Sequence, residues 1–298
     1  MIQFKCLLSR NIKLFFKDKG MFITALITPM ILLVLYATFL GNVYKNSFLD
    51  GMPEGITIAD SIIDGLVASQ LMSSILAVSC VTVSFCANMI MIQDKANGTI
   101  KDFTVSPVKS SVLAFAYYFA SLIVSLIICL SALALCLGYV AISGWYLTFA
   151  DVLLLILDVF ILVMFGTALS SLLYFFLSTQ GQMSAVGTII SSVYGFICGA
   201  YMPISQFPQA LQKVLSFLPG TYGTVLVRNH SMNGAFNEMI NSNIPEEVVT
   251  SLKDVVDCNI SIFDMDVSIP IMYLILLSTI VIVVSAYVLI NKYSKKAK

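Results

Sequence analysis

Apolar runs separated by short polar segments make up most of this 298-residue chain. A helix that crosses a bilayer needs about 20 mostly apolar residues. Six segments reach that length, and several exceed it, which indicates tilt or extension beyond the lipid. The pattern predicts an all-α membrane protein whose six spans are Met21–Leu40, Asp64–Ile92, Val112–Ile142, Val152–Leu177, Met183–Met202 and Ile269–Ile290.

The segment before the first span is amphipathic and too polar to span. When residues 2–19 are wound at about 100° per residue, apolar and charged side chains fall on opposite arcs. We expect this helix to lie in the membrane interface with its lysines near anionic headgroups. It would serve as a topogenic anchor, as a lever that contacts a cytoplasmic partner, or as both. The apolar arc holds Leu14, Leu7, Phe4, Phe15, Leu8 and Ile12, and the polar arc holds Ser9, Lys13, Lys17, Arg10 and Lys5.

The chain has no internal repeat, and we expect a single membrane domain over residues 1–298. Its parts are the interfacial helix (1–20), spans one to five (21–202), a long polar stretch (203–268), and the sixth span with a basic tail (269–298).

Composition supports the membrane interpretation. Apolar residues make up 59% of the chain and charged residues 11%. Soluble domains have about 45–50% apolar and about 25% charged residues. This imbalance excludes a soluble enzyme, a disordered chain and a nucleic-acid-binding domain. The seven cysteines show neither a disulfide framework nor the spacing of a zinc site, so we interpret them as packing residues.

Charge distribution predicts the topology. Sixteen basic and sixteen acidic residues balance to a formal net charge of zero. If the N-terminus is cytoplasmic, the internal segments hold twelve bases and three acids, a net charge of +9 (twelve less three). The excess of lysine and arginine on one side predicts a multi-pass protein of the cell membrane with both termini in the cytoplasm. The acidic stretch 238–266 is interpreted as a solvated external cap, with recruitment of a cationic peptide as the alternative.

The internal loop between spans two and three has features of a short, rigid helix. Gly98 permits a turn, and Thr99 can cap the helix that follows it. Ser106-Pro107 ends that helix and redirects the chain. Because two long spans hold it in place, such a helix would fit into a recess on another protein. The alternative is that the segment is only a connecting loop.

Two short runs in this loop carry a family resemblance. Gly98-Thr99-Ile100 and Val105-Ser106-Pro107-Val108 match the coupling-helix segment of the ABC-2 family of ABC-transporter permeases. The chain also resembles that family in its interfacial helix and six spans. Lys101 departs from the pattern, because an acid is usual there. The resemblance implies a coupling helix that contacts an ATPase through Asp94, Gly98, Thr99, Lys101, Asp102, Phe103 and Pro107.

A second match follows the fifth predicted span. The family carries a glycine and prolines there, followed by a tyrosine and an arginine. The resemblance implies a pair of external re-entrant helices and a type V exporter-like fold, in which irregular backbone is buried in protein or lines a cavity. The matching residues are Gly199, Pro203, Pro208, Pro219, Tyr222 and Arg228.

No Gly-x-x-x-x-Gly-Lys-Ser/Thr phosphate loop occurs in the sequence, so this chain is not an ATPase. The resemblance implies a non-catalytic permease without cofactor or metal, paired with two copies of an ATP-binding subunit that holds ATP and Mg²⁺. A second permease copy or a paralogue would complete the complex in the lipid bilayer, and no nucleic-acid partner is expected.

A stripe of small residues recurs every four positions in the fifth predicted span. Small side chains at this spacing form a smooth ridge on which another helix packs closely. The stripe predicts either packing within one bundle or an interface between permeases, and the family resemblance favours the interface. Its members are Gly187, Ser191, Gly195 and Gly199.

Asp158 is an acid within the fourth predicted span. A charge at mid-membrane costs about 2.5–3.5 kcal/mol on insertion scales, so such residues commonly have a function. We interpret Asp158 as a structural acid near the outer surface or as part of a substrate or ion pathway. The only histidine, His230, is interpreted as a loop residue because it has no catalytic companions.

The family resemblance implies the permease of an ATP-driven exporter, and by the same resemblance its substrate would be amphipathic, such as a drug, an antimicrobial peptide or a lipid-like molecule. The alternatives are an ATP-independent secondary transporter or channel and a non-transporting membrane scaffold or sensor.

Overall fold

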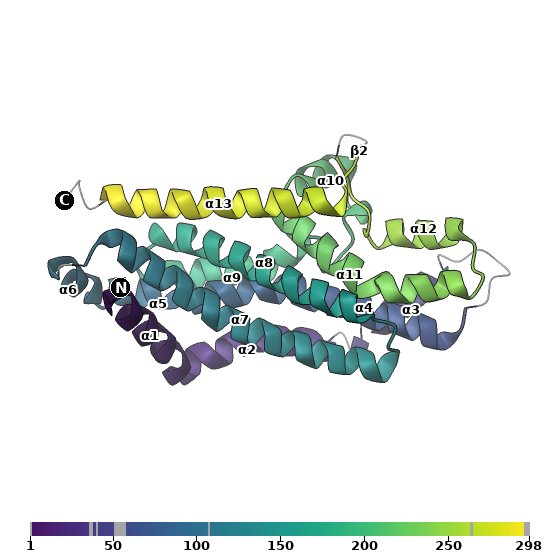
Figure 1. The fold of residues 1–298 in the computed structure, drawn as a ribbon, viewed down its shortest axis with the longest axis horizontal. Helices are drawn as coiled ribbons and strands as arrows, with labels where there is room; N and C mark the ends of the chain where they lie inside the picture. Colours follow the sequence, from purple (N-terminus) through teal and green to yellow (C-terminus); the bar gives the residue numbers. More distant parts are fainter. Residues whose placement is uncertain are drawn as a thin grey trace.

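The computed structural model describes residues 2–35, 38, 39, 41–50, 58–106, 108–262 and 265–294, and this part of the chain is almost entirely helical. Its long helices run along one axis in an elongated bundle (Figure 1). The helices are α1 (Ile2–Lys17), α2 (Lys19–Leu35), α3 (Gly41–Asp50), α4 (Asp60–Ala87), α5 (Met89–Ala96), α6 (Thr99–Val105), α7 (Ser110–Ser143), α8 (Phe149–Phe175), α9 (Gln180–Ile197), α10 (Gln209–Ser216), α11 (Pro219–Asn241), α12 (Glu246–Val255) and α13 (Ile269–Ser294). The other elements are the 3-10 helix η2 (Ile204–Gln206) and the antiparallel pair β1 (Ser261–Ile262) and β2 (Met265–Asp266).

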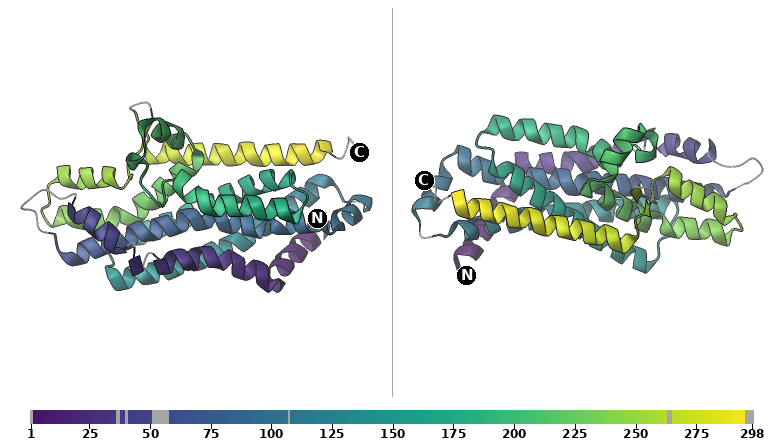
Figure 2. Two further views of the ribbon diagram at one scale, coloured as in Figure 1. Left: turned by 180° about the vertical axis from the view of Figure 1, so that it is seen from behind. Right: turned by 90° about the horizontal axis from the view of Figure 1, so that it is seen from above.

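Helix α4 forms the centre of the bundle. It packs against α2, α7, α8 and α11 (Figure 2), and nearly every side chain from Ile62 to Ala87 is buried. A helix that is apolar all round belongs inside a bundle. Gly166 of α8 permits close approach, because an added Cβ there would lie 2.9 Å from the Cα of Val81. Small residues therefore bring α4 and α8 together.

Four helical segments are long and apolar enough to cross a membrane: Asp60–Ala96, Ser110–Ser143, Phe149–Phe175 and Ile269–Tyr293. They correspond to the predicted spans two, three, four and six. A fifth is added if α1 and α2, which meet at an angle of 74°, are counted together. Helix α9, in the fifth predicted span, has only 18 residues and begins at the polar Gln180. The total of six spans therefore stays a prediction.

The amphipathic N-terminal segment is a helix, α1, that turns sharply away from α2. Asp18 lies at the bend, where its carboxylate accepts a hydrogen bond of 3.1 Å from the backbone N–H of Met21. Leu7, Asn11 and Phe15 form a buried strip, one turn apart, and α1 packs against α7. One face of α1 is thus covered by protein.

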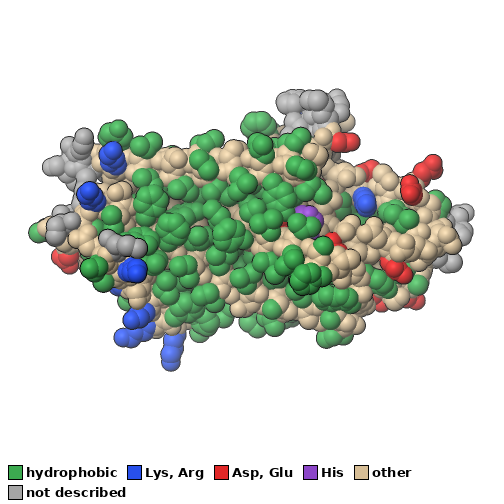
Figure 3. Space-filling view, viewed as in Figure 1, with side chains coloured by type: hydrophobic (Ala, Val, Ile, Leu, Met, Phe, Trp, Pro, Cys, Tyr) green, Lys and Arg blue, Asp and Glu red, His purple; other side chains and the backbone are tan. Residues whose placement is uncertain are grey.

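The two ends of the bundle carry opposite charge. Basic side chains gather at the end that holds α6 and the start of α1, and acidic side chains at the end that holds α12, with an apolar surface between them (Figure 3). We call these the basic end and the acidic end. Helix α7, with 34 residues, is about 51 Å long, whereas a hydrocarbon core is about 30 Å thick. The bundle is therefore longer than a membrane core is thick.

Residues 203–262 fold back onto the bundle. Pro208 precedes α10, and Pro219 is the first residue of α11, a position that proline favours because its missing N–H has no partner to lose there. Helix α11 packs along α4, α8 and α13, which makes much of this polar stretch part of the core. The insertion of α10 and α11 into a membrane as re-entrant helices stays a prediction.

The assignment of His230 to a loop is wrong. His230 lies within α11, and only 7% of its surface is exposed. Polar residues lower the mean hydropathy of α11, but several of them form hydrogen bonds inside the protein. The amide of Asn229, for example, donates to the carbonyls of Val225 at 2.9 Å and Cys258 at 2.5 Å.

Candidate functional site

A buried carboxylate joins three helices at the basic end. The guanidinium of Arg10 in α1 donates to both oxygens of Asp94 in α5, at 2.6 and 2.8 Å. The hydroxyl of Tyr117 in α7 donates to the same carboxylate at 2.6 Å. The Arg10 guanidinium also lies 5.2 Å from the ring centre of Phe103 in α6. We call these four residues the Asp94 junction.

The position of Asp94 differs from the sequence prediction in one respect. We expected Asp94 in the helix that faces a partner, but it lies one element earlier, in α5, with 5% of its surface exposed. Its charge is compensated by the paired arginine, which permits a carboxylate to be buried. Arg10, on the predicted polar arc of α1, directs its side chain at Asp94.

Helix α6 is the short helix predicted in the internal loop. Gly98 precedes it with a φ of 78°, a left-handed conformation that favours glycine. The prediction that the Thr99 hydroxyl caps α6 is wrong, because the cap position is Gly98 and no side chain caps the helix. Lys101 and Asp102 are exposed, and Phe103 is half-buried. The predicted contact residue Pro107 lies outside the described residues.

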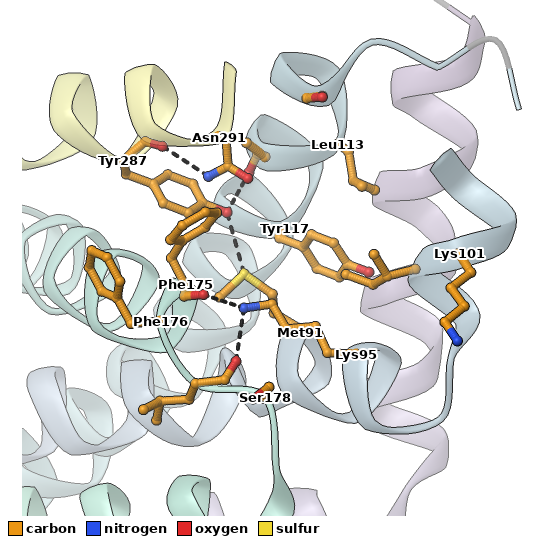
Figure 4. A pocket seen from close by; sticks show the side chains of 14 residues that line it. Met91, Lys95, Lys101, Leu113, Tyr117, Phe175, Phe176, Ser178, Tyr287 and Asn291 are labelled. Carbon is orange, nitrogen blue, oxygen red and sulfur yellow. Dashed lines mark hydrogen bonds between the residues drawn. The ribbon is translucent and has the colours of Figure 1, made fainter. Parts of the chain in front are cut away.

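Lys95 attaches α5 to the end of α8. Its ammonium donates to the carbonyls of Tyr174, Phe175 and Leu177, at 3.0, 2.5 and 2.9 Å. Figure 4 shows this side chain directed at the end of α8. A cation is favourable beside the unsatisfied carbonyls of a helix C-terminus. The segment before α6 is therefore connected to α1, α7 and α8.

The polar side chain of Asn88 lies at the break between α4 and α5. Its amide donates to the hydroxyls of Ser170 and Ser171 in α8, at 3.2 and 2.9 Å. Its carbonyl oxygen accepts from Ser121 in α7 at 3.1 Å. No local sequence pattern predicts this site, because the partners of Asn88 lie more than 30 residues away along the chain.

The small-residue stripe is divided between α9 and the turn that follows. A Cβ added at Gly195 would lie 2.3 Å from the ring of Tyr201, and one added at Gly199 would lie 2.8 Å from Ile204. Gly199 lies after α9 and has a φ of 71°. These two glycines make room for side chains of the same chain. Ser191 is half-buried on α9, and the permease interface stays a prediction.

Asp158 is part of a closed cluster nearer the acidic end. Its carboxylate bonds His230 Nδ1 at 2.6 Å and accepts from the hydroxyl of Tyr273 at 2.5 Å. Its exposed fraction is 2%. The cluster joins α8, α11 and α13, and the role of Asp158 as a structural acid or as part of a pathway stays a prediction.

Residues of the predicted re-entrant region form a second buried cluster. Arg228 donates to the carbonyl of Gly199 at 2.7 Å and lies 4.0 Å from the carboxylate of Asp257. The Asp257 carboxylate also accepts from the backbone N–H groups of Ile204 and Ser205. Burial raises the pKa of Asp257, and the Arg228 guanidinium partly offsets that rise. Nearby, the Tyr222 hydroxyl donates to the carbonyl of Ser216 at 2.7 Å.

Comparison with known protein families identifies a match. A family model described as ABC-2 type transporter matches residues 2–230, which include α1, α6 and the first half of α11. A comparison with curated proteins found none that matches the chain.

Proposed function

The chain belongs to the ABC-2 type transporter family, and from this membership we propose that it is the membrane-spanning subunit of an ATP-driven exporter. The absence of a phosphate loop from the sequence supports a separate ATP-binding subunit, which would hold ATP and Mg²⁺. In this proposal the chain itself is a non-catalytic permease.

Family membership carries the proposal, and the Asp94 junction supports the mechanical coupling that it requires. Helix α6 presents the exposed Lys101 and Asp102 at the basic end, while its Phe103 contacts Arg10 of α1. A partner that pushes α6 would therefore also move α1, and the Lys95 contact would transmit the displacement to α8. Packed helices and short hydrogen bonds transmit such displacements because they resist compression.

The charge distribution supports an orientation. The basic end would face the cytoplasm, in line with the lysine and arginine bias of membrane proteins, so that α6 meets the ATP-binding subunit there. Two such subunits and a second permease, identical or paralogous, would complete the exporter in the cell membrane. The substrate would be amphipathic, such as a drug, a peptide or a lipid-like molecule.

A copurification experiment tests the proposal. We expect the tagged chain, co-expressed with its ATP-binding partner, to retain that partner and to move substrate into inside-out vesicles only with ATP. Lys101→Glu changes the charge that α6 presents, and Gly98→Val strains the turn before it. Both variants should retain less of the partner and export more slowly. The matched control is Thr250→Lys, an exposed position in α12, which should behave as the parent chain does.

Two results would contradict the proposal. One is transport of substrate by the chain alone in vesicles that lack ATP, which would indicate a secondary transporter or channel. The other is full partner retention and ATP-driven export by both α6 variants, provided that each variant is folded in the membrane.

A further inference from the structure

A cavity of about 820 Å³ opens at the basic end, between the α5–α6 segment, α7, the end of α8 and the last turns of α13. Figure 4 shows residues of these elements around it. Sites for small organic molecules commonly measure about 300–1,000 Å³. The cavity is therefore large enough to hold a ligand of drug size.

Aromatic rings from three helices form much of the cavity wall. They belong to Tyr117 of α7, Phe175 and Phe176 at the end of α8, and Tyr287 of α13. The hydroxyl of Tyr287 bonds the sulfur of Met91 at 3.4 Å, which keeps its ring in place. Ring faces and edges provide a surface for an apolar ligand body.

The charged groups of the wall are cationic. Lys95 and Lys101 line the cavity, and none of the described lining residues is acidic. The three protons of the Lys95 ammonium are directed at carbonyls of the α8 end, so Lys95 acts on a ligand through its field. Lys101 lies on the exposed side of α6, at the edge of the cavity (Figure 4).

The cavity lies where two spans end. Ser110 is the first residue of α7, and Asn291 lies in the last turn of α13. These polar side chains, together with the positive end of the α7 dipole, surround an otherwise apolar space. An amphiphile at a membrane surface has the same division between a polar head and an apolar body.

We propose that this cavity binds an anionic amphiphile of drug size. Its phosphate or carboxylate head would lie between Lys101 and the start of α7, and its apolar body would lie among the four rings. The inference goes beyond the proposed function, because binding here requires neither an ATPase nor transport.

The experiment measures binding to the full chain in phosphatidylcholine nanodiscs without ATP. The probe is dodecyl phosphate with a photoreactive diazirine in its tail, and labelled peptides are mapped by mass spectrometry. We expect label on α7 near Tyr117 and at the end of α8. Unlabelled dodecyl phosphate should compete at least tenfold better than dodecyltrimethylammonium, because the wall repels a cation.

Three variants connect the label with the cavity. Leu113→Trp fills the space and should remove most of the labelling, and Lys101→Glu should weaken binding about tenfold. Lys17→Glu changes an exposed lysine of α1 outside the cavity, and its binding should stay within about twofold of the parent value. If Leu113→Trp proves unstable, Ser178→Trp fills the same cavity from the exposed link between α8 and α9.

Further competition identifies the source of the head group. If phosphatidylglycerol in the nanodisc suppresses labelling, the occupant is a bilayer lipid. If it does not, while dodecyl phosphate still competes, the occupant is a soluble amphiphile. The proposal is overturned if folded Leu113→Trp and Ser178→Trp label as the parent does. Equal competition by the ammonium amphiphile, or competition by inorganic phosphate as strong as that by dodecyl phosphate, would also overturn it.

Discussion

Asp94 illustrates how one side chain can connect helices that are distant in sequence. Its two oxygens accept hydrogen bonds from a guanidinium 84 positions earlier and a hydroxyl 23 positions later. Hydrogen bonds to charged groups contribute about 1.5–3 kcal/mol each. The exposed fraction of the Arg10 side chain is 32%, so water weakens its bond with the carboxylate.

Removing the charge of Asp94 should destabilise the chain. Asp94→Asn keeps an oxygen that can accept from Tyr117 but leaves Arg10 without its counter-charge. We expect a loss of about 1–3 kcal/mol in the free energy of unfolding. Denaturant unfolding in mixed micelles measures it. Asp102→Asn, at an exposed acid of α6, should stay within about 0.5 kcal/mol of the parent. Equal effects of the two variants would contradict a structural role for the Asp94 junction.

Element boundaries were predictable where hydrophobic runs are long. The predicted spans Val112–Ile142 and Ile269–Ile290 lie within α7 and α13. The break at Asn88 within the second span was not predicted, because residues on both sides are apolar and the polar partners come from α7 and α8. The pairing of His230 with Asp158 also escaped prediction, because 72 positions separate them.

Candidate functional residues were predictable only as far as local motifs reach. The turn at Gly98 and the short helix α6 follow from neighbouring residues in the sequence. The connection of α6 to α1 through Phe103 and Arg10 depends on tertiary packing, which no local pattern contains.

Helix α9 permits a direct test of the predicted permease interface. The space beside Gly195 and Gly199 is filled by side chains of the same chain. A larger residue at either position would therefore disturb the monomer before it disturbed an interface. Ser191→Cys adds a thiol at a half-buried position of α9 without filling those gaps. We expect Ser191→Cys, in a Cys6→Ser background, to form a disulfide-linked dimer when native membranes are oxidised.

The matched control for this dimer is Gly138→Cys. Gly138 lies on α7, and no atom would lie within 4 Å of an added Cβ there. Cross-linking of Gly138→Cys but not of Ser191→Cys would place the interface away from α9.

The whole molecule has one end that is basic and one that is acidic, and this polarity predicts its orientation (Figure 3). A membrane-impermeant maleimide can test it in a Cys6→Ser background. Cys6 is the only exposed cysteine among the described residues. Burial raises the pKa of Cys258, which lies nearer the acidic end, to about 12, so its thiol stays unreactive at neutral pH.

We expect Thr250→Cys in α12 to react in intact cells and Asp102→Cys in α6 to react only after the membrane is permeabilised. Both parent residues are exposed, so a difference in labelling would report the side of the membrane. The reverse order would invert the proposed orientation and would place α6 away from a cytoplasmic ATPase.

Helices α4 and α13 differ greatly in how much of their surface is covered by the rest of the protein. Helix α4 is almost completely enclosed, whereas most of the apolar surface of α13 is uncovered. With 26 residues, α13 is about 39 Å long, longer than a hydrocarbon core of about 30 Å. Tyr273 bonds α8 near one end, and Tyr287 bonds α5 and α7 near the other. Bilayer thickness should therefore act first on the tilt of α13, because hydrophobic mismatch reaches it directly and reaches α4 only through neighbouring helices.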